Sequence, residues 1–120
     1  MAFIVESRST NSPEVDVTVY SDASAERTVD GPPGVSGVMP ASYPAGSAGV
    51  ASFLADLASC GDVSAIPIAP TCLKSVSFGT TLKVRSGGQT SGDLECAAST
   101  SSPAQMALFR DAVTLAGGYY

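Results

Sequence analysis

The chain has 120 residues, which suffices for one hydrophobic core, and we expect a single domain over residues 1–120. The net charge is −5 and the six Lys and Arg residues form no cluster, so nucleic acid is not expected as a partner. No apolar run approaches the roughly 20 residues that cross a bilayer, so no membrane partner is expected. His is absent, which excludes Ser-His-Asp and Cys-His catalysis and most catalytic zinc sites.

The N-terminal part of the chain predicts short strands. Residues 1–14 begin with an apolar stretch and end in a polar run, and we interpret them as an edge strand or a flexible end. Val alternates with more polar residues from position 15 to position 20, which is typical of a half-buried strand. Turn chemistry at residues 21–24 and a return strand at residues 25–29 complete a first hairpin.

The composition and the first residues bear on localisation. Ala, Ser, Thr, Gly and Pro are abundant while charged residues make up only 14%, a profile typical of extracellular or particle-forming proteins. The first residues contain neither a basic region nor a long apolar region. We therefore expect a secreted or periplasmic protein if a signal peptide has been removed.

Residues 30–46 are rich in Pro and Gly and predict a long connection. Neither a helix nor a central strand tolerates this density of proline. The four prolines are Pro32, Pro33, Pro40 and Pro44.

A first helix is predicted from Ser47 to about residue 59. Ser47 is a suitable N-cap, and Gly61 stands where a left-handed C-terminal residue is expected. One apolar stripe runs along the helix and is expected to pack on a sheet. It consists of Val50, Phe53, Leu54 and Leu57.

The segment from residue 74 to residue 96 has the clearest strand pattern. Residues 75–85 alternate with a period of two, and Gly87 and Gly88 provide a tight turn. Leu94 and Cys96 resume the alternation, so a return strand that points Cys96 into the core is predicted.

A second helix begins at Ser102, where the sequence predicts a capping box. Pro103 suits the first helical position, and Gln105 can bond back to the cap. The predicted stripe is Met106, Phe109, Ala112, Val113 and Ala116, followed by Gly117 and Gly118. The fold class is therefore α+β in the order ββαββα, with two β-hairpins forming an antiparallel sheet that two helices cover.

The three cysteines are odd in number, and one disulfide with one free thiol is expected in an oxidising compartment. The hairpin register favours a Cys60–Cys72 bridge that closes a short loop, which would stabilise the fold by roughly 3 kcal/mol. Cys72–Cys96 remains the alternative.

The sequence contains no convincing active site, and we expect a protein that is not an enzyme and holds no cofactor or metal. The loop between the first helix and the second hairpin is stiffened by prolines and predicts a rigid surface for a protein partner. Its candidate contact residues are Ile66, Ile68 and Lys74.

Two families of small protease inhibitors resemble this chain. The element order, with a Gly-Gly turn before a final helix, is similar to the emfourin family of metalloprotease inhibitors over residues 15–117. The segments Ala55-Asp56-Leu57-Ala58-Ser59-Cys60-Gly61-Asp62 and Cys72-Leu73-Lys74 resemble the subtilisin-inhibitor family of streptomycetes. This second resemblance implies that Lys74 is the specificity residue, although the chain lacks that family's four-cysteine pattern.

We therefore expect a small non-enzymatic binding protein, with a secreted protease inhibitor as the leading hypothesis and a protease as the protein partner. The alternative is a structural or self-assembling subunit of a virus or particle. The oligomeric state is not determined by the sequence.

Overall fold

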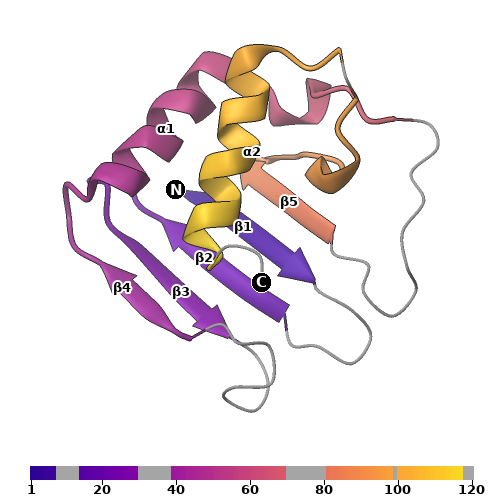
Figure 1. Cartoon of the computed structure of the whole chain (residues 1–120). Coiled ribbons are helices and arrows are strands. Elements are labelled where there is room, and N and C mark those ends of the chain that lie inside the picture. The colour runs from indigo at the N-terminus through magenta and orange to yellow at the C-terminus, as the bar shows by residue number, and fades with distance from the viewer. Residues whose placement is uncertain (8–13, 30–38, 70–80, 99, 118–120) are drawn as a thin grey trace.

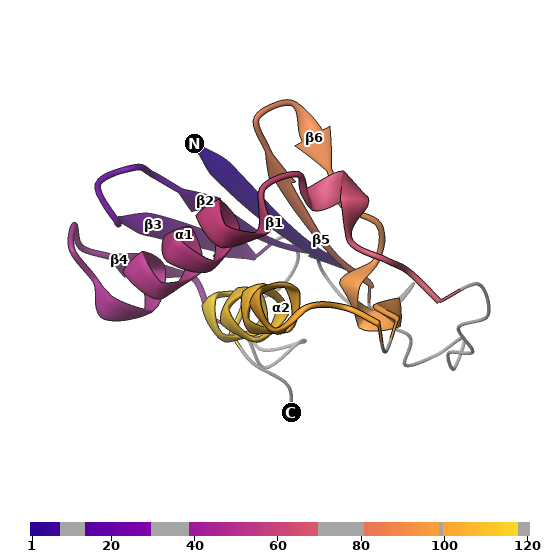
Figure 2. The same cartoon turned by 90° about the horizontal axis from the view of Figure 1, so that it is seen from above.

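The computed structural model describes residues 1–7, 14–29, 39–69, 81–98 and 100–117. Within these residues, six strands form one antiparallel sheet in the order β4-β3-β2-β1-β5-β6. Two helices, α1 (Ala48–Cys60) and α2 (Pro103–Leu115), lie side by side on one face of it (Figure 1 and Figure 2). The strands are β1 (Ala2–Ser7), β2 (Glu14–Val19), β3 (Ala25–Val29), β4 (Ala41–Tyr43), β5 (Thr81–Ser86) and β6 (Gln89–Thr90).

Strand β1 is central, so the prediction of an edge strand or a flexible end is wrong for it. It pairs with β2 on one side and with β5 on the other. Ile4 lies opposite Val17 and Val84, and all three side chains are buried. These inward positions give β1 an apolar neighbour on each side, and β5 is too distant in sequence for a local pattern to predict the pairing.

The first hairpin is confirmed as β2 and β3, with the predicted bounds close to the observed ones. The Pro/Gly-rich connection contains a strand that the sequence did not predict, since β4 pairs with β3. β4 is only three residues long and stands between Pro40 and Pro44 at the edge of the sheet. Proline is tolerated at such an edge because it interrupts no ladder with a further strand.

The second hairpin is only partly as predicted. Gly87 and Gly88 form the turn with positive φ, but β6 is two residues long. Ser91 Oγ then accepts a hydrogen bond from Val84 N at 2.9 Å, and Asp93 Oδ1 accepts one from Leu82 N at 3.0 Å. These side chains take the place of a backbone partner along β5, so the predicted return strand ends early.

Leu94 and Cys96 lie on a short 3-10 helix, η2 (Leu94–Cys96), rather than on a strand. Asp93 caps this turn by accepting a hydrogen bond from Glu95 N. Both Leu94 and Cys96 are nevertheless buried, as predicted. A similar 3-10 helix, η1 (Val63–Ala65), follows α1.

Both helices are confirmed. Gly61 ends α1 at a φ of 70°, whereas Ser47 makes no capping bond to the helix and donates its hydroxyl to Pro44 O. The capping box of α2 is present in both directions, between Ser102 and Gln105. At its other end, Arg27 of β3 donates to Leu115 O at 3.1 Å and so ties the last turn of α2 to the sheet.

The core lies between the sheet and the helices. Its largest fully buried side chains include Phe53 of α1, Leu108 of α2 and Leu82 of β5. The α+β class, the antiparallel sheet and its cover of two helices are thus as predicted. The predicted ββαββα order is wrong, because β1 and β4 are two further strands of the same sheet. The observed order is ββββαββα.

Candidate functional site

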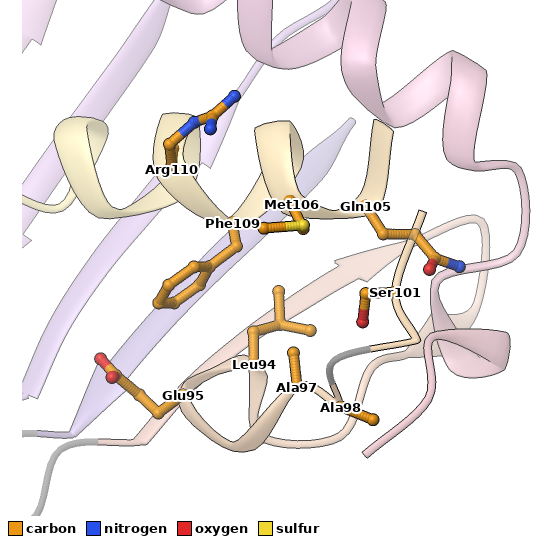
Figure 3. A pocket seen from close by; sticks show the side chains of 9 residues that line it. All are labelled: Leu94, Glu95, Ala97, Ala98, Ser101, Gln105, Met106, Phe109 and Arg110. Carbon is orange, nitrogen blue, oxygen red and sulfur yellow. The ribbon is translucent and has the colours of Figure 1, made fainter. Parts of the chain in front are cut away.

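An apolar pocket lies between the N-terminal half of α2 and the segment that leads from η2 into it (Figure 3). Its cavity volume is about 480 Å³. We call it the α2 pocket. It is lined by Leu94, Glu95, Ala97, Ala98, Ser101, Gln105, Met106, Phe109 and Arg110.

Backbone contacts hold the walls of the α2 pocket in place. The capping box fixes where α2 begins, and Asp93 fixes η2. Ile68 forms a β-bridge with Ala97, flanked by hydrogen bonds from Ala69 N to Cys96 O at 2.8 Å and from Ala98 N to Pro67 O at 2.9 Å. The pocket therefore rests on a largely preformed frame, as ligand sites usually do.

The side chains of the α2 pocket divide into an apolar centre and a polar rim. Phe109, Met106 and Leu94 converge on the cavity, while Glu95 lies at its periphery and the charged end of Arg110 points away from it (Figure 3). Met106 is 52% exposed, so its thioether is accessible to a partner. The pocket thus offers an accessible apolar surface rather than a cluster of reactive groups.

The sequence did not predict this pocket, although it singled out two of its residues. Met106 and Phe109 belong to the stripe that was expected to enter the core. Ala112, Val113 and Ala116 of that stripe are buried as predicted, and Phe109 packs against the core. Leu108 and Leu115 are buried as well, so the buried face extends to one side of the predicted stripe and leaves Met106 exposed. The available signal was that α2 carries more apolar residues than one face can bury.

The predicted partner-binding loop does not present its two isoleucines together. Ile66 is only 4% exposed and belongs to the core, so the prediction that it contacts a partner is wrong. Ile68 is 36% exposed, and its side chain lies against Gly92, where a Cβ atom would approach it to 2.8 Å. Lys74 lies outside the described residues.

Cys60 carries a free thiol at the end of α1, so the predicted Cys60–Cys72 bridge is not formed. The chain after Cys60 is held by the core contacts of Val63 and Ile66 instead. Cys72 lies outside the described residues. Burial, together with the nearby charge of Asp56, raises the pKa of the Cys60 thiol, which makes it a poor nucleophile at neutral pH.

A pair of carboxyl groups meets between the two helices. Burial and a hydrogen bond with Asp56 of α1 raise the pKa of Asp111 of α2 to about 6. Ser52 donates its hydroxyl to Asp111 Oδ2 at 3.0 Å. Two carboxyl groups that share a proton can work as an acid and a base. The α2 pocket is lined by neither of them, and we interpret them as a pH-sensitive contact between helices.

In the part of the chain that the structure describes, no three His, Cys, Asp or Glu side chains gather as a metal site would require. Among the same residues, neither helix has the length and apolarity that a membrane span needs.

Comparisons with protein-family models, with curated proteins and with solved structures find no match to this chain. Its function is therefore inferred from the side chains of the site.

Proposed function

We propose that this chain is a small non-enzymatic binding protein that takes an apolar side chain of a protein partner into the α2 pocket. The observation that carries this proposal is an accessible apolar concavity on a rigid frame, with Met106 and Phe109 at its centre and charge at its rim. Interfaces are commonly anchored by one large side chain that fills such a pocket, surrounded by polar contacts.

The size and lining of the α2 pocket suit an aliphatic or aromatic anchor. A cavity of about 480 Å³ lies within the range of sites that enclose small organic groups. Burying one Leu or Phe side chain is worth about 1.5–3 kcal/mol, so one anchor alone binds weakly and the rim must contribute the rest. Met106 suits this role because the flexible thioether adapts to different apolar shapes.

The lining of the α2 pocket includes one acidic and one basic residue, Glu95 and Arg110, beside the apolar centre. Arg110 is exposed and points away from the cavity, so its guanidinium can donate two hydrogen bonds to a carboxylate of a partner that extends beyond the α2 pocket. Gln105 Oε1 is occupied by Ser102 N, so the capping box keeps this side chain in position. Polar contacts around the α2 pocket therefore select among partners and add to the modest contribution of the apolar centre.

The experiment uses the methionine methyl groups as reporters. The chain has three Met residues, of which Met39 and Met106 are 59% and 52% exposed. We expect N-acetyl-leucine amide and N-acetyl-phenylalanine amide, added to protein with ¹³C-labelled Met methyl groups, to shift the Met106 signal with a saturable dependence. N-acetyl-alanine amide should shift it far less.

A matched pair of variants checks the assignment. Met106→Ser should abolish the binding detected at pocket amides, whereas Met39→Ser removes an equally exposed Met elsewhere and should leave it intact. Equal shifts of all Met signals, or no saturable shift of Met106, would refute the proposal.

The narrower proposal is that the partner is a protease and that the chain inhibits it. Ile68 supports this proposal, since the hydrogen bonds on either side of it hold an exposed side chain on a rigid backbone. Titration against a panel of serine proteases and metalloproteases tests it. Absence of inhibition at stoichiometric excess would reject the inhibitor function and leave the α2 pocket proposal standing.

A further inference from the structure

The face of the sheet opposite the helices carries a regular arrangement of side chains. The alternation that buries Ile4, Val17 and Val84 under the helices points their neighbours to the other face. Both helices lie on the buried side (Figure 2). The open face presents Phe3, Val5 and Ser7 of β1, Glu14, Asp16 and Thr18 of β2, Glu26 and Thr28 of β3, and Thr81, Lys83 and Arg85 of β5.

The charges on this open face are separated by sign. Glu14, Asp16 and Glu26 lie on one side of β1, and Lys83 and Arg85 lie on the other. The register places Asp16 and Lys83 in one row, each directly opposite Val5. They are two strand spacings apart, which is about 10 Å and too far for a direct ion pair.

The centre of the open face is apolar. Phe3 and Val5 are half-buried, and the charged residues flank them on both sides. Phe3 lies opposite Thr18 and Arg85, so its ring stands between a hydroxyl and a cation. An apolar centre with charged flanks is the usual composition of a protein interface.

We propose that this face binds a second copy of the chain, through a two-fold axis that runs along β1. A two-fold interface brings the same surface patch together with itself. Rotation about β1 places the β2 side of one copy over the β5 side of the other. Asp16 then faces Lys83 of the second copy, and Phe3 meets its own counterpart.

The charges select this axis. A two-fold axis across the strands would place Asp16 and Glu26 over the same acidic residues of the second copy, and like charges in contact are unfavourable. The axis along β1 instead places the acidic side of each copy, β2 and β3, over the basic side of the other copy, which begins with β5. Two sheets that pack face to face in this way keep their strands within about 30° of each other.

A second copy fits this surface better than a strongly charged partner does. The chain as a whole has a net charge of −5. The face itself carries three acidic side chains on one side of β1 and two basic ones on the other, so it holds two of the six Lys and Arg residues of the chain and has a small net charge. A small net charge with opposite signs on opposite sides of β1 favours contact with a second copy over contact with a strongly charged partner.

Sedimentation equilibrium of the full chain, from micromolar to millimolar concentration, measures the association. We expect a monomer–dimer equilibrium that weakens as salt is raised, since exposed charges contribute to it. Asp16→Lys should weaken the dimer by at least about tenfold, because two cations then meet at each contact. Lys83→Glu should weaken it by a similar factor.

Mixing the two variants gives the decisive result. A copy with Asp16→Lys and a copy with Lys83→Glu restore both opposite-charge contacts in a mixed dimer, so the equimolar mixture should associate about as strongly as the original chain. The double variant with both substitutions in one chain should recover its own dimer for the same reason.

The matched control adds the same two units of positive charge on the other layer of the molecule. Ala55 and Ala58 are exposed on α1, and Ala55→Lys combined with Ala58→Lys should leave the dimer unchanged. A chain that stays monomeric at millimolar concentration would overturn the proposal. So would a dimer indifferent to the two reversals, a mixture that fails to associate, or a control that weakens association as much as Asp16→Lys does.

Discussion

Asp56 and Asp111 face each other across the two helices, and their contact is least favourable when both are ionised. Burial and the neighbouring carboxyl raise the pKa of Asp111 from 3.8 to about 6. Between these two pH values the folded chain holds a proton that the unfolded chain has released. The free energy of unfolding therefore falls as the pH rises from about 4 to about 6, and this contribution stays lost at higher pH.

Asp111→Asn should stabilise the protein at neutral pH. The Asn amide can donate to Asp56 as a protonated carboxyl does, and its oxygen can still accept from Ser52. Because the site is partly exposed, we expect a gain of only about 0.5–1 kcal/mol at pH 7 and little change near pH 3.5. Urea unfolding across this range measures both values.

Asp22→Asn is the contrasting variant, because the pKa of Asp22 is lowered in the folded protein whereas that of Asp111 is raised. Hydrogen bonds from the Ser24 hydroxyl and then the Ser24 backbone lower the pKa of Asp22. Its contribution is present above the unfolded value and is lost as the pH falls, so the Asn variant should gain nothing at pH 7. If both variants respond alike, the effect of Asp111 is one of net charge and not of its contact with Asp56.

At the scale of single elements, the helices follow local signals and the second hairpin does not. The capping box of α2 was predicted from residues 102–105 because all its partners lie within one turn. The return strand after Gly88 was predicted wrongly because Ser91 and Asp93 bind amides of β5. Alternation alone cannot distinguish a side chain that continues a ladder from one that replaces it.

Ser102→Ala should destabilise the protein by about 1 kcal/mol, since it removes the acceptor for Gln105 N at the start of α2. Ser47→Ala is the matched control, because Ser47 holds the same position before α1 but makes no capping bond to it. Urea unfolding of both variants compares them. If the two variants lose the same free energy of unfolding, the capping bond of Ser102 stabilises the protein no more than the loop hydrogen bond of Ser47 does.

At the scale of the whole molecule, the free thiol of Cys60 changes the expected cross-link. It favours the alternative pairing of Cys72 with Cys96, which the hairpin register had ranked second. Under oxidising conditions we expect one alkylated cysteine per chain without reductant, Cys60, and one peptide that links the other two. Because the pKa of the Cys60 thiol is raised, we expect Cys60 to be alkylated more slowly than an exposed thiol.

Mass spectrometry of the alkylated and digested protein checks this expectation. A linked peptide that contains Cys60 would contradict it and restore the original pairing. Three alkylated cysteines without reductant would show that no bridge forms under those conditions.

The elements whose signals lie within a few residues were determined by the sequence alone. These are the β2–β3 hairpin, the Gly87-Gly88 turn, both helices and the capping box of α2. Each depends on side-chain periodicity, on positive φ or on a capping bond between near neighbours, so no distant contact is needed to predict it.

The tertiary structure decided what depends on distant partners. β1 is central because residues 81–86 pair with it, and Ile66 is buried because the core reaches the loop after α1. The α2 pocket exists because packing turned Leu108 inward and left Met106 outside. Periodicity identifies an apolar face, but only the neighbours of that face decide whether it is covered or left open to a partner.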